Sequence, residues 1–467
     1  MIELTPAELA GIVGGRLFRP DGATIPDVVD GPVVADSRLA EPGSIFFALQ
    51  GETTHGHEFA ASAVASGAVL VVAEAELDLG VPIVVVDDSL AALSTLARSV
   101  VATVRSQGRL RVVAVTGSNG KTTTKNMLRA ILERVGPVVA PRGSFNNQVG
   151  APLSMLGVDR ETRFLVVEMG ASAPGEISRL VSIVVPDVAI VLKVGLAHAG
   201  GFGSIEETAK AKAELVTELP ADAVAVLNAD DTRVAAMAGS TRARVVTFGL
   251  SESADVRAED VATTVRGTEF TLVAGQTRTT ATLRILGEHN VMNALAALAA
   301  VREFGVGFDE AVEALEELAR AERWRMELLA APDGVTVIND AYNASPDSMA
   351  AALKTLAEVT RGANRAIAVL GEMAELGEYS DEEHDRIGRL VVRLNIDILV
   401  VVGHGARHIH NAAGLEGSWN GESVLVTDAD GAYDLLRGEL RSGDVVLVKS
   451  SNSAGLRLLG DRIAGVS

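Results

Sequence analysis

The sequence predicts an α/β protein with three domains, and three observations support this prediction. The chain has 467 residues, more than one hydrophobic core usually serves. Short apolar runs alternate with helical patterns along nearly its whole length, as in parallel sheets covered by helices. Residues 111–125 join a buried-strand pattern directly to a glycine-rich loop. We therefore expect a small α/β N-terminal domain at 1–106, a central P-loop mononucleotide-binding domain with a parallel sheet at 107–321, and a C-terminal Rossmann-like domain at 322–467.

The composition narrows the class of protein. Hydrophobic residues make up 48% of the chain, enough for substantial cores. The formal net charge is −20, from 41 basic and 61 acidic residues, which argues against a nucleic-acid binder. The absence of cysteine excludes disulfides, thiolate zinc sites and a cysteine nucleophile. No apolar run reaches membrane-spanning length and the first residues lack a signal-peptide pattern, so we expect a cytoplasmic protein with no membrane span.

The first domain is predicted from short apolar runs at 45–49, 69–73 and 83–86. Helix-like stretches at 59–66 and 90–104 lie between and after them. The polar segment 105–108 is expected to join this domain to the next.

The central domain is predicted from four apolar runs followed by helical patterns, at 112–115, 164–167, 188–192 and 224–227. This alternation is typical of a parallel sheet with helices on both faces. Residues 263–286 read as hairpin-like strands that add antiparallel structure to that sheet. A helix pair at about 291–304 and 309–321 closes the domain.

In the third domain the same alternation resumes. Strands are predicted at 335–338, 366–370, 398–402, 423–426 and 445–448, and the clearest helix at 348–359. The pattern indicates a second doubly wound sheet.

The loop after residue 115 has the residues that a phosphate needs. Gly117 and Gly120 allow a tight turn and a close approach of the backbone, Lys121 adds a positive charge, and Thr122 and Thr123 supply hydroxyls where a helix should begin. The spacing is shorter than in the usual P-loop, whose first glycine would fall at residue 115. Nucleotide hydrolysis or transfer is therefore the leading hypothesis.

Glu168 is the candidate metal ligand. It follows the apolar run 164–167, and a carboxylate at the carboxyl end of a central strand lies where such sheets bind ligands. There it can hold Mg²⁺ beside the phosphates. The alternative is a helix-capping or salt-bridged glutamate.

Two further segments have an ordinary structural interpretation as well as a functional one. His198 lies in a glycine-rich loop, where a histidine is usually a surface or hydrogen-bonded residue. Lys210 and Lys212 lie in a helical stretch whose composition favours solvated Glu–Lys pairs such as Glu206–Lys210.

Three polar segments are candidates for ligand binding. Asn146 and Asn147 can bind a polar ligand or make Asx turns. Asn290 opens an alanine-rich helix and can cap it. Asp340 begins a polar segment, 340–349, at a strand-to-helix turn, a place suited to binding a sugar or phosphate.

Together these segments resemble the Mur ligase family, the ATP-dependent amide-forming enzymes of peptidoglycan precursor synthesis. The matches run through nearly the whole chain in the expected order, at 36–38, 117–123, 146–147, 168–170, 198, 210–214, 289–290 with 293, and 340–345. Segments 342–346 and 371–377 resemble the member of the family that adds D-alanyl-D-alanine. The Asp-Asn-Pro-Arg motif of the diaminopimelate- or lysine-adding relative is absent.

The resemblance implies a reaction. ATP phosphorylates the terminal carboxylate of a UDP-N-acetylmuramoyl-tripeptide, and the amine of D-alanyl-D-alanine attacks the acyl phosphate. A tetrahedral intermediate then collapses to amide and phosphate. Such phosphoryl transfer depends on positioning and on neutralised charge more than on covalent help from the protein.

The resemblance also assigns metal and catalytic roles. It implies that Lys121 contacts the β- and γ-phosphates, and that Thr122 and Glu168 hold one Mg²⁺. His198 helps to hold a second Mg²⁺, and Lys212 matches the family lysine that becomes a carbamate and ligates metal.

For the substrates, the resemblance carries over two groups of residues. The ATP-binding group contains Lys121 and Thr122 together with the other loop residues Gly117, Ser118, Asn119, Gly120 and Thr123. It also contains Asn290, Arg325 and Asp340, which match the family positions that bind adenine, phosphate and ribose. The UDP-substrate group is Ser37, Arg38, Asn146 and Asn147.

Trp324 precedes Arg325 where the family usually has glycine, so the hinge into the third domain is expected to differ. Lys193 also departs from the family, standing where asparagine is common.

We expect a monomer whose partners are small-molecule substrates. Two alternatives of other kinds remain at this point. A nucleotide-dependent switch or motor ATPase shares the phosphate loop but needs neither flanking domain. A folylpolyglutamate-type ligase shares the central fold but lacks the N-terminal domain, so the residues before 107 disfavour it.

Overall fold

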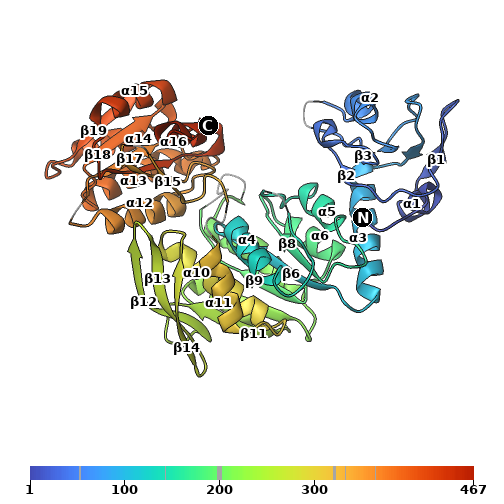
Figure 1. Cartoon of the computed structure of the whole chain (residues 1–467), viewed down its shortest axis with the longest axis horizontal. Coiled ribbons are helices and arrows are strands. Elements are labelled where there is room, and N and C mark those ends of the chain that lie inside the picture. The colour runs from blue at the N-terminus through green and yellow to red at the C-terminus, as the bar shows by residue number, and fades with distance from the viewer. Residues whose placement is uncertain are drawn as a thin grey trace.

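The computed structural model describes residues 1–51, 54–141, 143–196, 202–318, 322–331, 333–362 and 364–466. Within these residues the chain forms three sheets of five, nine and six strands, each built from one continuous stretch of sequence. We call the units around them the N-terminal, central and C-terminal bodies. Figure 1 shows the N-terminal and C-terminal bodies at opposite ends of the molecule, with the central body between them. The fold class is confirmed, whereas the domain boundaries stay a prediction.

The N-terminal body has the strand order β1-β5-β4-β3-β2. Only β1 is antiparallel to its neighbour. The three predicted strands are present, and the two that sequence reasoning missed, β1 and β2, are too short to give a periodic signal. The elements are α1 (Pro6–Ile12), β1 (Arg16–Phe18), β2 (Val33–Val34), β3 (Ile45–Phe47), α2 (His57–Ala65), β4 (Leu70–Ala73), β5 (Ile83–Val85) and α3 (Ser89–Ser106).

Helix α3 connects the N-terminal body to the central one. The Asp88 side chain caps its first turn by accepting from two backbone N–H groups. Near its other end, Arg105 forms an ion pair with Asp187 of the central body, 2.7 Å long. Because α3 ends at Ser106, the predicted joint at 105–108 is partly helical. The chain turns away from the helix at Gly108, whose φ is +82°.

The central sheet has the order β14-β13-β12-β11-β10-β9-β6-β8-β7. It is parallel from β7 to β12, and β13 and β14 add antiparallel hairpins, as predicted. The strands are β6 (Arg111–Thr116), β7 (Val138–Val139), β8 (Phe164–Glu168), β9 (Val188–Val191), β10 (Val224–Asn228), β11 (Arg244–Gly249), β12 (Val256–Thr264), β13 (Gly267–Ala274) and β14 (Thr277–Leu283).

Both faces of the central sheet are covered, which explains its continuous apolar runs. Along β6, Val113 and Val115 point into one core, and Val112 and Ala114 into another on the opposite face. The helices are α4 (Lys121–Leu132), α5 (Gly150–Met155), α6 (Glu176–Ile183), α8 (Ile205–Thr217), α9 (Thr232–Ala236), α10 (Glu288–Arg302) and α11 (Phe308–Glu317).

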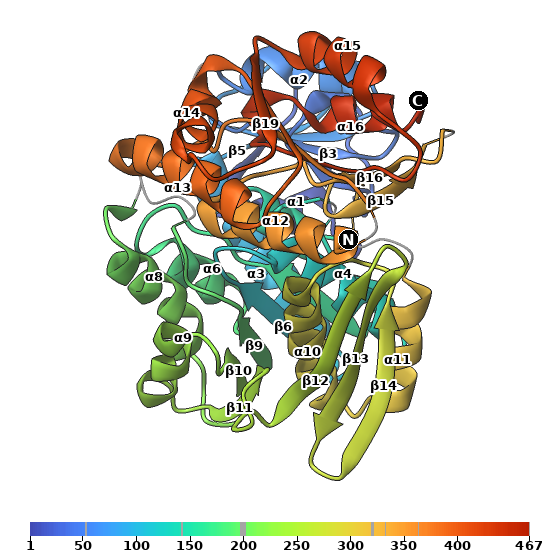
Figure 2. The ribbon, with the colours of Figure 1, turned by 90° about the vertical axis from the view of Figure 1, so that its left-hand side faces the viewer.

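The C-terminal sheet has the order β15-β16-β20-β17-β18-β19 and is parallel except for β15. Helix α12 packs on β12 of the central body, and Figure 2 shows it along the boundary between the two bodies. The elements are β15 (Glu327–Ala330), β16 (Thr336–Asn339), α12 (Pro346–Thr360), β17 (Ala366–Leu370), α13 (Ser380–Arg393), β18 (Ile398–Val402), α14 (Arg407–Leu415), β19 (Glu422–Val426), α15 (Ala429–Glu439), β20 (Val445–Lys449) and α16 (Arg457–Ile463). Across the described residues, no helix is long and apolar enough to cross a membrane.

Candidate active site

The predicted phosphate loop connects β6 to α4 at the carboxyl edge of the central sheet. Gly117 and Gly120 have φ values of +155° and +88°. A Cβ at Gly117 would lie 2.9 Å from Cβ of Leu192, and one at Gly120 would collide with the Asn293 side chain. Glycine is thus required at both positions by backbone conformation and by space. The loop is braced by Ser118, whose N–H donates to the carbonyl of Lys193 at 2.8 Å.

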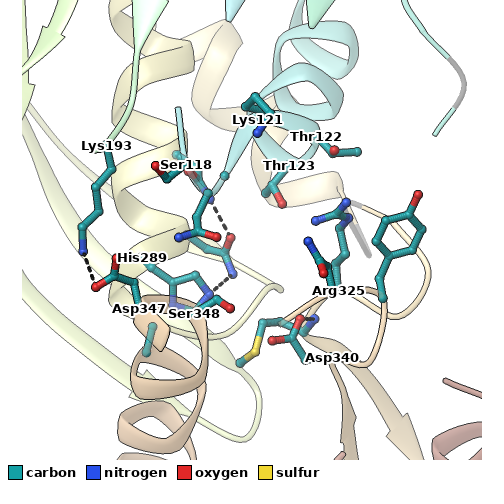
Figure 3. A pocket seen from close by; sticks show the side chains of 18 of the residues that line it. Ser118, Lys121, Thr122, Thr123, Lys193, His289, Arg325, Asp340, Asp347 and Ser348 are labelled. Atoms are coloured by element: carbon teal, nitrogen blue, oxygen red, sulfur yellow. Dashed lines mark hydrogen bonds and ion pairs between the residues drawn. The ribbon is translucent and has the colours of Figure 1, made fainter. Parts of the chain in front are cut away.

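Lys121 (Figure 3) is the first residue of α4. Its Nζ donates to the carbonyl of Gly117 at 2.8 Å. Burial lowers the pKa of this ammonium; the negative charge of Glu168 opposes that shift and the positive charge of Arg325 adds to it. The group therefore lies where an added anion would be strongly stabilised.

Thr122 and Glu168 meet beside the loop, as the metal hypothesis requires. Oγ1 of Thr122 donates to Oε2 of Glu168 at 3.1 Å, and Nδ2 of Asn146 donates to Oε1 at 2.8 Å. Both Thr122 and Glu168 are buried. Two oxygen ligands at the phosphate loop suit Mg²⁺, which takes few protein ligands and completes its shell with water and phosphate. The described residues hold no cluster of three or more His, Asp or Glu side chains that would suggest another metal.

The C-terminal body supplies the opposite wall. Arg325 donates from Nη2 to Oγ of Ser144 at 3.0 Å, and its guanidinium lies 4.2 Å from the ring centroid of Tyr342. Asp340 is held by Nζ of Lys449 at 2.6 Å and by the backbone N–H of Met326 at 3.0 Å. Arg325 and Asp340 thus come together as predicted, although neither is near the loop in sequence.

The start of α10, in the central body, lines the same cavity. Asn290 donates to the carbonyl of Leu286 at 2.8 Å, and its side-chain oxygen accepts from Asn293 at 3.0 Å. Burial lowers the pKa of His289 to about 4; Lys449 and Lys193 push in the same direction and Asp340 opposes them. His289 is therefore a neutral imidazole at physiological pH.

These side chains enclose a cavity of about 320 Å³ between the central and C-terminal bodies (Figure 3). Across it, Oγ of Ser345 donates to Oδ1 of Asn119 at 3.1 Å, and Lys193 lies 3.7 Å from Asp347. Nδ2 of Asn119 is buried without a partner among the described residues, so it can donate to a ligand. The predicted residues that line the cavity are Ser118, Asn119, Gly120, Lys121, Thr122, Thr123, Asn146, Glu168, Asn290, Arg325 and Asp340.

A second cavity, of about 380 Å³, meets the first at Lys121 and Asn146. Asn147 and Arg179 also line it. Oδ1 of Asn147 accepts from the N–H groups of residues 149 and 150, which is the Asx turn foreseen as the alternative. The amide nitrogen of Asn147 remains the group that could meet a ligand.

Two predicted residues of the N-terminal body are not brought to the phosphate loop. Ser37 and Arg38 lie in the 3₁₀ helix η1 (Ser37–Leu39) of the N-terminal body and line neither cavity. The exposed Arg38 pairs with Asp36 at 2.6 Å. His198 lies outside the described residues.

Lys212 and Lys210 have opposite environments on α8. Lys210 is exposed and pairs with Glu207 at 2.6 Å; its predicted partner, Glu206, lies near Arg233 instead. Lys212 is buried, with Nζ 5.9 Å from the ring centroid of Phe202. Burial lowers the pKa of Lys212 to about 7, and the charge of Lys121 adds to the shift. The prediction of a solvated helix from composition is right for Lys210 and wrong for Lys212.

Sequence reasoning missed Lys449 and Ser144. Lys449 is the first polar residue after the apolar run of β20, the same signal that identified Glu168 after β8. Applying that rule to every strand would have found it. Ser144 carries no such signal, because its role depends on Thr122 and Arg325 coming within 3.0 Å of its hydroxyl.

Comparisons with known proteins identify the family. The chain matches three family models: the Mur ligase family catalytic domain at 33–111, the Mur ligase middle domain at 115–301, and the Mur ligase glutamate ligase domain at 324–452. The chain therefore belongs to the Mur ligase family.

Within that family, several relatives with high identity to this chain bear the same name. It is 45% identical over 503 residues to the UDP-N-acetylmuramoyl-tripeptide–D-alanyl-D-alanine ligase of Mycobacterium tuberculosis, covering 99% of this chain and 98% of the relative. The ligase of the same name from Escherichia coli is 34% identical over 459 residues, covering 98% and 97%. The crystal structure of MurF from Acinetobacter baumannii superposes with a TM-score of 0.87 at 31% identity, covering 99% of each chain. The structure of MurF from Thermotoga maritima in complex with ADP superposes with a TM-score of 0.81 at 28% identity, covering 94% of this chain and 98% of that one.

Proposed function

We propose that this chain is an ATP-dependent ligase that joins UDP-N-acetylmuramoyl-tripeptide to D-alanyl-D-alanine through an acyl phosphate, in peptidoglycan precursor synthesis. One observation carries the proposal: the phosphate loop and the Arg325–Asp340–Lys449 group close one cavity from two bodies. The comparisons add support, because a relative that is 45% identical to this chain over nearly its whole length bears that ligase's name. A switch or motor ATPase has no need of this second wall.

The chemistry follows from where the charges lie. A carboxylate oxygen of the tripeptide attacks the γ-phosphorus of ATP, and ADP leaves. The amine of the dipeptide then attacks the acyl carbon, loses a proton and expels phosphate, leaving an amide. Lys121 and the N–H groups at the start of α4 face the transferred phosphoryl group, whose negative charge they stabilise. Arg325 approaches the same region from the C-terminal body.

Thr122 and Glu168 are the residues that would hold Mg²⁺. When bound, the ion would neutralise phosphate charge as the transfer proceeds. His198 is assigned to a second ion by resemblance to the family.

Lys212 is proposed to become a carbamate. Carbon dioxide adds to the neutral amine and not to the ammonium, and a pKa of about 7 leaves a large neutral fraction at physiological pH. The product is an anion that can ligate metal, whereas an ammonium would repel it.

The nucleotide and UDP assignments have unequal support. Asn290, Arg325 and Asp340 line the cavity and are proposed to bind adenine, phosphate and ribose. Asn146 lies between the two cavities, which suits contact with the muramoyl peptide. The roles of Ser37, Arg38 and Asn147 on the UDP-substrate side rest on the resemblance. We also propose that the enzyme is a cytoplasmic monomer and binds no nucleic acid.

A phosphate-release assay tests the proposal. Purified protein with ATP and Mg²⁺ should release phosphate only when UDP-N-acetylmuramoyl-tripeptide and D-alanyl-D-alanine are both present. Single amino acids offered as the amine should give little turnover. Rapid ATP hydrolysis without either substrate would instead support the switch or motor ATPase.

A further inference from the structure

Arg325 lies between two residues with unusual backbone conformations. In the described part of the chain, five non-glycine residues have positive φ, and two of them are Trp324 at +59° and Met326 at +49°. Bulky residues rarely adopt the left-handed region. Such conformations persist only when the surrounding structure imposes them, and they concentrate at functional sites.

The side chain of Trp324 is held by contacts with its ring and at its polar edge. The guanidinium groups of Arg323 and Arg457 lie 4.8 Å and 5.1 Å from its ring centroid. Its Nε1 donates to Oδ2 of Asp461 at 2.9 Å, and Arg323 forms an ion pair with the same oxygen at 2.9 Å. Cation–π contacts and a charged acceptor are among the stronger ways to hold an indole ring.

The anchor of this cluster is buried in the C-terminal body. Asp461 lies on α16, is 5% exposed, and accepts through Oδ1 from Nδ2 of Asn339 at the end of β16. The backbone of Trp324 is held too: its N–H donates to Glu327 at 2.9 Å, and its carbonyl accepts from the N–H of Tyr342 at 3.1 Å. Every one of these partners belongs to the C-terminal body or to the segment entering it.

We infer that Trp324 is a positioning residue for Arg325. The cluster of Arg323, Trp324, Arg457 and Asp461 makes Arg325 part of the C-terminal body and imposes the backbone that aims its guanidinium at the phosphate loop. That guanidinium reaches Ser144, which also contacts Thr122. A glycine at 324 adopts the same φ at no cost, but it also adopts many others, so it permits the conformation without selecting it. The inference rests on the proposed function, in which Arg325 binds a nucleotide phosphate.

The test is a double-mutant cycle in the full-length enzyme. The variants are Trp324→Gly, Arg325→Ala and the pair, with KM for ATP, kcat and Tm measured for each. Asp461→Asn and Trp324→Phe weaken the cluster more gently than Trp324→Gly. Asp461→Asn keeps the size of the side chain and removes its negative charge, and Trp324→Phe keeps an aromatic ring and removes the indole N–H donor. Trp419→Phe is the matched control: it removes an indole donor that bonds to the carbonyl of Ile396 in the same body, away from the cavity.

Trp324→Gly should raise KM for ATP about tenfold, as expected if the correct Arg325 geometry is populated about a tenth of the time. The change in kcat should be smaller than the change in KM. Trp324→Phe and Asp461→Asn should show part of the increase in KM, and Trp419→Phe should leave KM unchanged. In the Arg325→Ala background, Trp324→Gly should add nothing, because coupled residues are not additive.

Two results would overturn the inference. One is an equal KM effect of Trp324→Gly with and without Arg325, which would mean that Trp324 acts elsewhere. The other is an unchanged KM in Trp324→Phe and Asp461→Asn while Arg325→Ala is impaired. If Arg325→Ala itself binds ATP normally, it is the phosphate assignment of Arg325 in the proposed function that fails.

Discussion

The two walls of the cavity are built in different ways. The loop wall comes from seven consecutive residues, 117–123, held between one strand and one helix of the central body. The opposite wall joins Arg325, Asp340 and Lys449, and its central ion pair links residues 109 positions apart. The loop wall is therefore a local motif, whereas the opposite wall exists only once the C-terminal body has folded and packed against the central one.

The walls also differ in how their charges are used. Lys121 contacts a backbone carbonyl and no carboxylate within hydrogen-bonding distance among the described residues, so its charge is available to a phosphate. Lys449 is 2% exposed and already paired with Asp340. We propose that the loop wall acts on the reacting phosphoryl group, and that the opposite wall positions the nucleotide. Changes to the first should lower kcat, and changes to the second should raise KM for ATP.

The largest effect is expected from Lys121→Ala. Loss of a preorganised charge facing the transferred phosphoryl group should lower kcat by about 10³-fold. Phosphate release with saturating substrates measures it, and Tm should change little because Lys121 contacts only a loop carbonyl. Lys210→Ala, which removes an exposed lysine paired only with Glu207, is the control and should stay active. Near-normal turnover of a folded Lys121→Ala protein would contradict the assignment of the loop wall.

Glu168→Gln should weaken metal binding and thereby lower kcat by about 10²-fold at low Mg²⁺. The amide keeps the shape of the side chain but removes the charge that a hard cation prefers. A Mg²⁺ titration of activity should shift to higher concentration and recover part of the loss. An unshifted titration would mean that another residue holds the ion.

Lys212→Ala should also lose most activity, and added short-chain carboxylic acids should restore part of it by replacing the carbamate. In the unsubstituted enzyme, depletion of CO₂ should lower activity and bicarbonate should restore it. Because the pKa of Lys212 is about 7, the neutral amine prevails above that pH and the ammonium below it. At equal concentrations of dissolved CO₂, restoration should therefore be faster at pH 8 than at pH 6. Normal activity of Lys212→Ala would remove this residue from the metal site.

The smallest effect on kcat is expected from Lys449→Met, which changes the opposite wall. Removing the lysine leaves Asp340 unpaired in a largely buried site, so unfolding by denaturant should show a loss of about 3 kcal/mol. KM for ATP should rise while kcat changes little. The double variant Lys449→Met/Asp340→Asn should recover stability without recovering KM. Full recovery of both would mean that the pair has a structural role only.

The sequence predicted the loop wall well and the opposite wall poorly. Buried parallel strands give continuous apolar runs, so the strands around β6, β8 and β9 were found, and Glu168 was identified by its place after one of them. Arg325 was identified only by resemblance to a family, whereas Asp340 was also marked by the polar segment that it begins at a strand-to-helix turn. Lys449 and Ser144 were missed. Composition alone suggested that Lys212 is solvated, because it cannot distinguish two lysines on one helix when only one faces the core, and the metal role of Lys212 came only from the resemblance.

By itself, the sequence determined the class of the sheets, the phosphate loop and its glycines, and the residue that ends each apolar run. These features have a local signal in the sequence, because periodicity and backbone sterics act between neighbouring residues. Only the tertiary structure decided that Arg325 faces the loop, that Lys449 holds Asp340, that Lys212 is buried, and that Trp324 is locked in a left-handed conformation. Each of those outcomes depends on which distant side chains share a low-dielectric environment, and that is set by how the bodies pack.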